Sequence, residues 1–143
     1  MLIKTALIVG FAMTASGVSA GAQQASAVQI SEAWSRPAAA GGNGAGFFTI
    51  TNAGGKPDTL VDVTSLAANK VEMHQTSMAN GVMSMQQIQG GIPLPPGSSI
   101  TFAPGGKHLM VMGLKAALHS GGKLPLTFKL KSGRQLTIQA PVR

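Results

Sequence analysis

The histidines and methionines of this sequence are concentrated in one segment. Six of the eight methionines and all three histidines lie between Met73 and His119, and the chain has no cysteine and no tyrosine. Four of these residues stand at defined intervals: His74, then Met85 eleven positions on, then His108 and Met110 with one residue between them. Thioether sulfur and imidazole nitrogen together form a ligand set for a soft metal ion, above all Cu(I).

Strand geometry predicts how these four residues meet. Side chains two apart on a β-strand share a face, so His108 and Met110 point the same way. His74 lies in one predicted strand and Met85 in the next, and the Asn-Gly turn between the two strands favours a hairpin. A hairpin that supplies one His and one Met, facing a third strand that supplies the other two residues, predicts a four-ligand site near the rim of the fold.

The ligand types select the metal. Four neutral ligands leave the charge of a bound ion uncompensated, which penalises a dication more than a monovalent ion, and Glu72 is the only acidic residue close to them in sequence. Magnesium, calcium and manganese prefer oxygen ligands, and zinc sites rarely use thioether sulfur. Type 1 electron-transfer copper requires a cysteine thiolate. The set therefore favours storage or transfer of Cu(I).

The remaining members of the cluster have other expected places. Met83 and Met112 share a face with the ligand methionine of their own strands, so either residue can replace or supplement a ligand, and the sequence leaves this open. Met73 falls on the opposite face from His74 and is expected in the core. Met78 and His119, in a turn and a loop, are expected to be exposed.

The elements that must position the cluster are short strands. Residues 124–131 and 135–140 alternate apolar and polar side chains around a Ser-Gly turn, which predicts a C-terminal hairpin with one buried face. Glycine-rich residues 38–46 and proline-rich residues 90–98 are predicted loops. Seven further strands are predicted over residues 28–34, 46–51, 59–64, 70–76, 82–88, 99–102 and 109–114. With the two strands of the hairpin this makes nine, which favours an all-β antiparallel sandwich.

The first residues have the layout of a secretory signal peptide. Lys4 precedes an apolar run and then mostly small residues, with possible cleavage after Ala20 or Ala27. We therefore expect a signal peptide over residues 1–27 and a single exported domain over residues 28–143. No later segment is apolar for long enough to cross a bilayer. Because export permits disulfides and the chain has no cysteine, packing alone must stabilise the domain.

The charge balance excludes one class of partner. The formal net charge is +7, and from Lys107 to Arg143 there are seven basic residues and no acidic one. Scattered basic residues, a single Trp and no Tyr argue against nucleic-acid binding. The basic C-terminal region is either a solvated face or a docking surface for an acidic partner.

The spacing of the four residues resembles a known motif. The periplasmic copper chaperone A (PCuAC) family carries His-x10-Met-x21-His-x-Met, and His74, Met85, His108 and Met110 stand at those places. One departure is that 22 residues separate Met85 from His108, one more than in the motif, and the loop between them absorbs such an insertion. The segments flanking the motif, such as 33–37, 46–52, 81–85 and 106–114, agree as well.

This resemblance implies both fold and function. It implies a cupredoxin-like, immunoglobulin-like Greek-key β-sandwich that binds Cu(I) in the periplasm and is not an enzyme. It also implies a monomeric metallochaperone that delivers copper toward the binuclear copper centre of cytochrome c oxidase, with a copper-accepting oxidase subunit or another copper chaperone as transient partner. The alternative is a copper tolerance protein that sequesters Cu(I) without specific delivery.

Overall fold

The chain folds into β-strands joined by turns. The structure is a computed structural model that describes residues 27–143, so the predicted signal peptide lies outside the described residues except for Ala27. Within the described part there is no helix able to span a membrane. The ten strands are β1 (Val28–Ser35), β2 (Gly44–Asn52), β3 (Asp58–Thr64), β4 (Ala68–Ala79), β5 (Val82–Gln87), β6 (Ile92–Leu94), β7 (Ser99–Phe102), β8 (Lys107–Leu114), β9 (Lys123–Leu130) and β10 (Gln135–Pro141).

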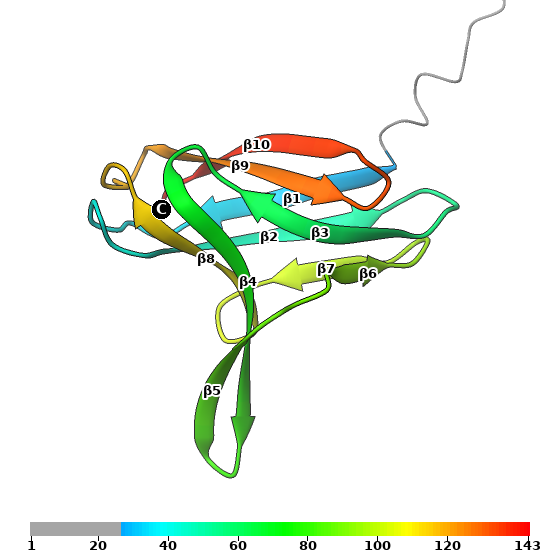
Figure 1. The fold of residues 1–143 in the computed structure, drawn as a ribbon, viewed down its shortest axis with the longest axis horizontal. Helices are drawn as coiled ribbons and strands as arrows, with labels where there is room; N and C mark the ends of the chain where they lie inside the picture. The colour runs from blue at the N-terminus through cyan, green and yellow to red at the C-terminus, as the bar shows by residue number, and fades with distance from the viewer. Residues whose placement is uncertain (1–26) are drawn as a thin grey trace, which may run out of the picture.

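The strands form two antiparallel sheets packed face to face (Figure 1). The larger sheet has the order β1-β2-β8-β4-β5, and β7 also pairs with β2. The smaller sheet has the order β10-β9-β3-β6. The predicted all-β antiparallel sandwich is therefore confirmed, and β4 and β8, which are distant in sequence, are neighbours in the larger sheet.

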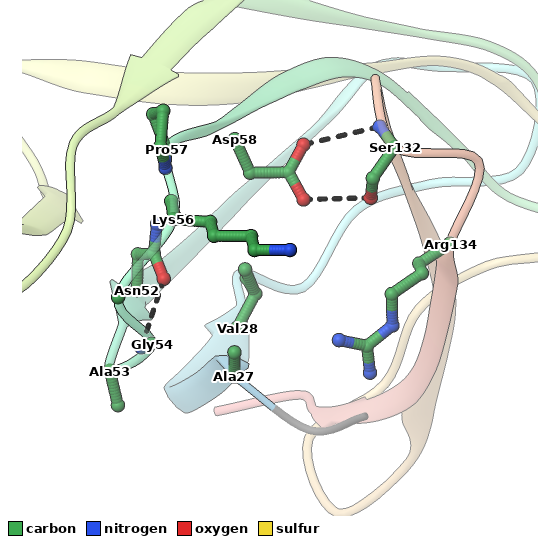
Figure 2. A pocket seen from close by; sticks show the side chains of 11 residues that line it. Ala27, Val28, Asn52, Ala53, Gly54, Lys56, Pro57, Asp58, Ser132 and Arg134 are labelled. Carbon is green, nitrogen blue, oxygen red and sulfur yellow. Dashed lines mark hydrogen bonds between the residues drawn. The ribbon is translucent and has the colours of Figure 1, made fainter. Parts of the chain in front are cut away.

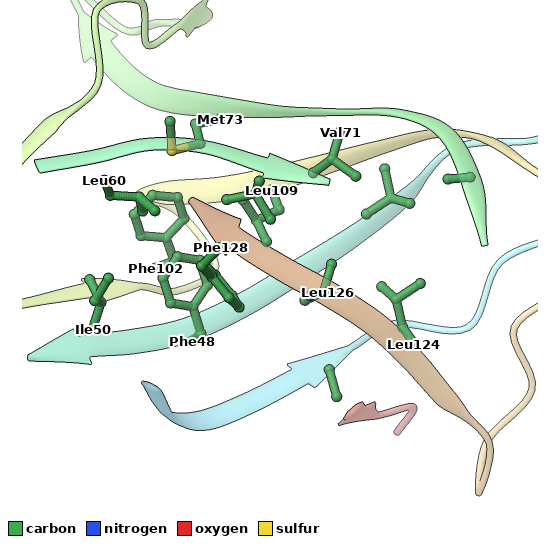
Figure 3. Close-up of a cluster of buried hydrophobic side chains, with 14 of the residues drawn as sticks. Phe48, Ile50, Leu60, Val71, Met73, Phe102, Leu109, Leu124, Leu126 and Phe128 are labelled. Atoms are coloured by element: carbon green, nitrogen blue, oxygen red, sulfur yellow. The ribbon is translucent and has the colours of Figure 1, made fainter. Parts of the chain in front are cut away.

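Alternation along the strands builds the core. In β9 every second residue is buried, from Leu124 to Leu130, and β10 pairs with it in the register expected of the predicted C-terminal hairpin. Three phenylalanine rings from different strands meet between the sheets: Phe48 lies 4.4 Å from Phe102 and 4.7 Å from Phe128, measured between ring centroids (Figure 3). Met73 is also buried there, 6% exposed, as predicted.

One predicted loop contains a strand. Residues 90–98 were expected to be a loop because prolines do not fit a central strand. Residues 92–94 nevertheless form β6, which is why the structure has one strand more than the nine predicted. The expectation was wrong because β6 lies at the edge of the smaller sheet, where Pro93 stands opposite Thr59 and is exposed. Proline has no N–H to donate, but on an edge strand this loses no hydrogen bond, because no further strand lies on the outer side to accept it.

The hairpin of β4 and β5 extends beyond the sandwich (Figure 1). Asn80 and Gly81 both have positive φ angles, 53° and 75°, as a two-residue type I′ turn requires. All six residues of β5 are exposed. The predicted hairpin is confirmed, and it places Met85, one of the four predicted ligands, at the edge of the larger sheet.

Candidate metal centre

The register of the larger sheet brings the four predicted ligands to one face. His74 in β4 and His108 in β8 are direct cross-strand partners, with ring centroids 5.6 Å apart. Met110, two residues along β8, stands opposite Glu72, and Met85 in β5 stands opposite Thr76. Because cross-strand partners and residues two apart share a face, all four side chains lie on the same side of the sheet.

That side is the outer face of the sandwich. Leu109 and Val111, which alternate with His108 and Met110 along β8, are completely buried in the core. The two imidazoles and Met110 are half-buried on the outer face, whereas Met85 is 55% exposed. The site is therefore supported by the core on one side and open to solvent at the hairpin.

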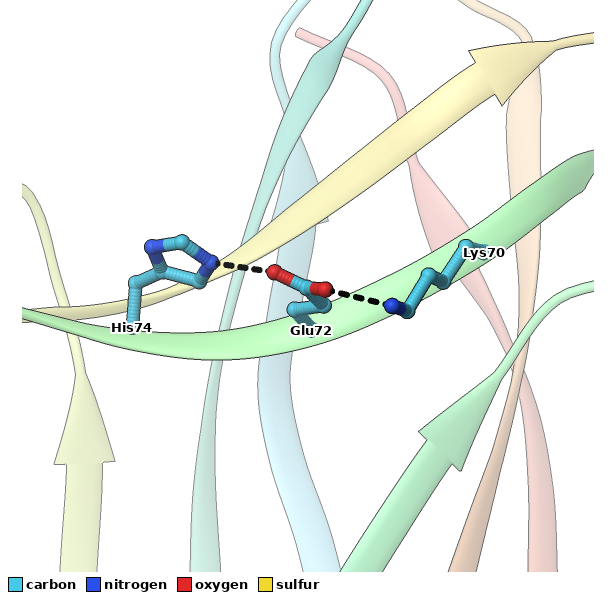
Figure 4. A network of polar contacts seen from close by, with 3 residues as sticks. All are labelled: Lys70, Glu72 and His74. Atoms are coloured by element: carbon cyan, nitrogen blue, oxygen red, sulfur yellow. Dashed lines mark hydrogen bonds and ion pairs between the residues drawn. The ribbon is translucent and has the colours of Figure 1, made fainter. Parts of the chain in front are cut away.

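Glu72 adds a carboxylate to this face. Its side chain, only 12% exposed, accepts a hydrogen bond from Nε2 of His74 at 2.8 Å and pairs with Nζ of Lys70 at 2.8 Å (Figure 4). The hydrogen bonds from Lys70 and His74 lower the pKa of Glu72 below its ordinary value, so the group is a carboxylate at neutral pH. The sequence analysis named Glu72 as the acidic residue nearest the four ligands but did not predict its contact with His74, although the Glu-x-His spacing places the two side chains on one face.

The other ring nitrogen of His74, Nδ1, has no partner of this kind in the part of the chain that the structure describes. Nδ1 is buried and has no hydrogen-bond partner among the described residues. With Nε2–H donated to the carboxylate, Nδ1 carries the lone pair that a metal ion needs. A carboxylate that orients the second nitrogen of a ligating imidazole is a common supporting arrangement in metal sites.

His108 sits in a more cationic surrounding. Partial burial lowers the pKa of His108, and a hydrogen bond to the backbone of Gly106 opposes this effect. Repulsion from Arg36, and from His74 whenever its ring is protonated, lowers the pKa of His108 further. The Arg36 guanidinium lies 5.2 Å from the centre of the Phe47 ring, which packs on Trp34 at 4.6 Å. The lowered pKa keeps the His108 ring neutral at pH 7, as metal binding requires.

Apart from the buried Met73, the other methionines of the cluster lie along the same face as the four predicted ligands. Met112 follows Met110 on β8 and stands opposite Lys70, while Met83 and Met78 are partners near the tip of the hairpin. Met78 is 69% exposed, as predicted, but it belongs to β4 and not to a turn. His119 is exposed in the loop after β8.

A surface hollow of about 790 Å³ lies elsewhere, beside the start of β1 and the turn between β9 and β10 (Figure 2). Asp58 there accepts hydrogen bonds from the hydroxyl and the backbone N–H of Ser132, at 2.8 and 3.2 Å. None of its eleven lining residues is a histidine or a methionine. The hollow offers no soft ligand, and the outer face of the larger sheet remains the candidate centre.

Together, fold and site define a cupredoxin-like sandwich that carries a histidine-methionine cluster on one outer face. The model of the family described as "Putative lipoprotein LpqE-like" matches residues 28–142. The chain belongs to this LpqE-like family, that of the PCuAC domains. The predicted family is thereby confirmed.

Three known proteins illustrate the relationship. "Putative lipoprotein Lxx21020" of Leifsonia xyli is 39% identical over 121 residues, which are 85% of this chain and 72% of that protein. The structure of the apo PCuAC domain from PmoF1 matches with a TM-score of 0.68 and 25% identity, over 82% of this chain and 93% of that one. The Cu(I) form of DR1885 from Deinococcus radiodurans matches with a TM-score of 0.62 and 28% identity, over 85% of both chains.

Proposed function

We propose that the protein binds one Cu(I) ion on the outer face of its larger sheet, through His74, Met85, His108 and Met110. The observation that carries the proposal is the direct cross-strand pairing of His74 with His108, with Met110 next to them on the same face. Two neutral imidazoles and two thioethers suit a soft monovalent ion. The Cu(I) form of DR1885, to which this chain is similar, supports copper as the metal.

Each residue has a distinct task in this proposal. His74 binds through Nδ1, because its Nε2–H is held by Glu72. The Glu72 carboxylate offsets part of the charge of the bound ion without being a ligand. Met110 and His108 form the fixed side of the site on β8, whereas exposed Met85 closes it from the hairpin.

We further propose that the bound ion is cargo. An open site lets an acceptor protein replace ligands one at a time, and Met85 is the ligand that an acceptor reaches first because it is 55% exposed. We propose a periplasmic metallochaperone that delivers Cu(I) toward the binuclear centre of cytochrome c oxidase. Export is supported by the predicted signal peptide and by the description of the family as lipoproteins.

Anaerobic titration with Cu(I) against a chromophoric chelator tests the site. The purified domain binds one equivalent tightly enough to compete with the chelator. His108→Ala and Met110→Ala are each expected to weaken this binding by more than the roughly 10- to 100-fold loss that is typical of removing a residue that only supports a metal ligand. His119→Ala, which changes an exposed histidine outside this face, is the matched control and retains full affinity. Unchanged affinity in both site variants would remove the proposed site.

A second experiment separates delivery from sequestration. The protein is loaded with isotopically labelled Cu(I) and mixed with the apo form of the copper-accepting oxidase subunit fragment. Delivery predicts transfer of the label within minutes, at a rate that depends on acceptor concentration. If the label stays on this protein at equilibrium, the function is copper sequestration.

A further inference from the structure

The tip of the β4–β5 hairpin exposes apolar side chains to an unusual extent. Met78, Val82, Met83 and Met85 are 69%, 65%, 64% and 55% exposed. Four of the six large hydrophobic side chains that are exposed in residues 27–143 therefore lie on this one hairpin, and three of the four are methionines. A group of exposed apolar side chains on a small domain indicates a binding role, since folding gains nothing from it.

The three methionines share one face, and that face leads to the candidate metal centre. Met78 and Met83 are direct cross-strand partners, and Met85 lies two residues from Met83 on β5. The register runs without interruption from this pair to His74, so the thioethers and the imidazole project from the same side of the ribbon. Val82 pairs with Ala79 and projects from the opposite side.

The spacing suits a shared soft ion. Direct cross-strand partners have Cβ atoms about 4.5–5.5 Å apart, and diagonal neighbours such as Met78 and Met85 are about 7–8 Å apart, within reach of long side chains. Methionine has three rotatable side-chain bonds, so its sulfur can move to meet an ion without a change in the backbone. Three thioethers and no anionic group form a ligand set for Cu(I) or Ag(I) and not for a hard dication.

The distribution of charged residues also favours a cation at the hairpin end of this outer face. Residues 75–106 contain no Asp, Glu, Lys, Arg or His, in a chain whose formal net charge is +7. At the other end of the face Met112 stands opposite Lys70, and the charge of Arg36 acts on His108. A cation therefore meets least repulsion along the hairpin.

We propose that Met78 and Met83, with Met85 as the shared third ligand, form a second and weaker Cu(I) site at the tip of the hairpin, through which the ion enters and leaves the principal site. The inference rests on the proposed function, because it assumes that His74, His108 and Met110 hold the ion more tightly. Met85 belongs to both ligand sets, so the ion passes between them with Met85 bound throughout.

The test uses a double variant, Met78→Leu with Met83→Leu, which keeps the apolar volume of two exposed residues and removes both sulfurs. Wild-type protein with ¹³C-labelled methionine methyl groups is titrated anaerobically with Ag(I), a redox-inert substitute for Cu(I). The first equivalent is expected to shift the methyl signals of Met85 and Met110. The second is expected to shift those of Met78 and Met83 and to shift Met85 again, because Met85 is shared by the two ions. The double variant is expected to bind only the first equivalent.

Kinetics give the second readout. Release of Cu(I) to a bicinchoninate chelator is expected to slow by about tenfold in the double variant, with the affinity of the first equivalent unchanged. Adding Val82→Met to the double variant returns one of the two lost sulfurs, but on the opposite side of the hairpin, and it is expected not to restore the rate. Two results together would overturn this inference alone, provided that one equivalent still binds tightly. The Met78 and Met83 signals of the wild-type protein would not shift with the second equivalent, and the double variant would release Cu(I) at the wild-type rate. Failure to bind the first equivalent would overturn the proposed function.

Discussion

The contact between Glu72 and His74 leads to a specific prediction for Glu72→Gln. Glutamine has nearly the same shape and its carbonyl oxygen still accepts a hydrogen bond from Nε2–H, but the negative charge is lost. In the wild-type protein this carboxylate has two contacts of 2.8 Å, one to His74 and one to Lys70. Both are charge-assisted when the carboxylate is ionised, and such hydrogen bonds are about twice as strong as neutral ones.

The size of the effect follows from what the substitution retains. Loss of a residue that orients a metal-binding histidine typically lowers metal affinity by about 10- to 100-fold. Glu72→Gln keeps the acceptor, so we expect about a tenfold loss of Cu(I) affinity, and Glu72→Ala, which removes the acceptor, should approach about 100-fold. Lys70→Gln is the control: its ammonium is exposed, and such an exposed ion pair has little effect, so affinity should change by less than about threefold.

The assay is anaerobic competition for Cu(I) at pH 7.5, with circular dichroism of each apo variant to verify its fold. Nitrogen-15 spectra of the imidazoles provide a second readout, because the wild-type protein should show the Nε2–H form of His74. Tighter binding in Glu72→Gln and Glu72→Ala would refute the reasoning, since it would mean that Glu72 competes with copper for Nε2. Equal affinity in all three proteins would show that Glu72 does not position His74.

Three further predictions concern pH and stability. Burial lowers the pKa of His108, so protons compete with Cu(I) for this ring only below the ordinary pKa of histidine. The Cu(I) affinity should therefore be constant from about pH 8 to 7 and fall below about pH 6.5. A constant affinity down to about pH 5 would contradict imidazole ligation. Leu109→Ala should lower the free energy of unfolding of the apo protein by about 2–5 kcal/mol in urea denaturation, because Leu109 is fully buried directly behind the site; a loss below about 1 kcal/mol would argue against the described core. Partial burial raises the pKa of Asp58, but hydrogen bonds from Ser132 and Thr59 outweigh it, and the net pKa is lowered. Asp58→Asn should therefore destabilise the protein at pH 7 by at most about 1 kcal/mol, with the difference disappearing as the pH falls below about 4; an equal loss at pH 3 would contradict this origin.

Local sequence patterns predicted a large part of this structure. The alternation in residues 124–131 fixes which side chains of β9 are buried, and the Asn-Gly turn fixes the pairing of Met85 with Thr76. His108 and Met110 share a face in any strand that contains both. These predictions hold because each depends on residues within a few positions of one another.

The rest depends on contacts between distant residues. The pairing of His74 with His108 joins positions 34 residues apart, and no local pattern specifies that register. The same holds for the edge position of β6, which makes Pro93 acceptable, and for the burial of Phe47 under Trp34 on the outer face. The contact between Glu72 and His74 could be predicted only in part. Their spacing places both side chains on one face of β4, but only the side-chain conformations show that they form a hydrogen bond.

X-ray absorption at the copper edge tests the central claim most directly. The protein is loaded with one equivalent of Cu(I) under anaerobic conditions, and the first coordination shell is measured for the wild type, His108→Ala and Met110→Ala. The proposed site predicts two nitrogen and two sulfur ligands in the wild type, one nitrogen fewer in the first variant and one sulfur fewer in the second. A wild-type shell made only of sulfur, or only of nitrogen and oxygen, would contradict it.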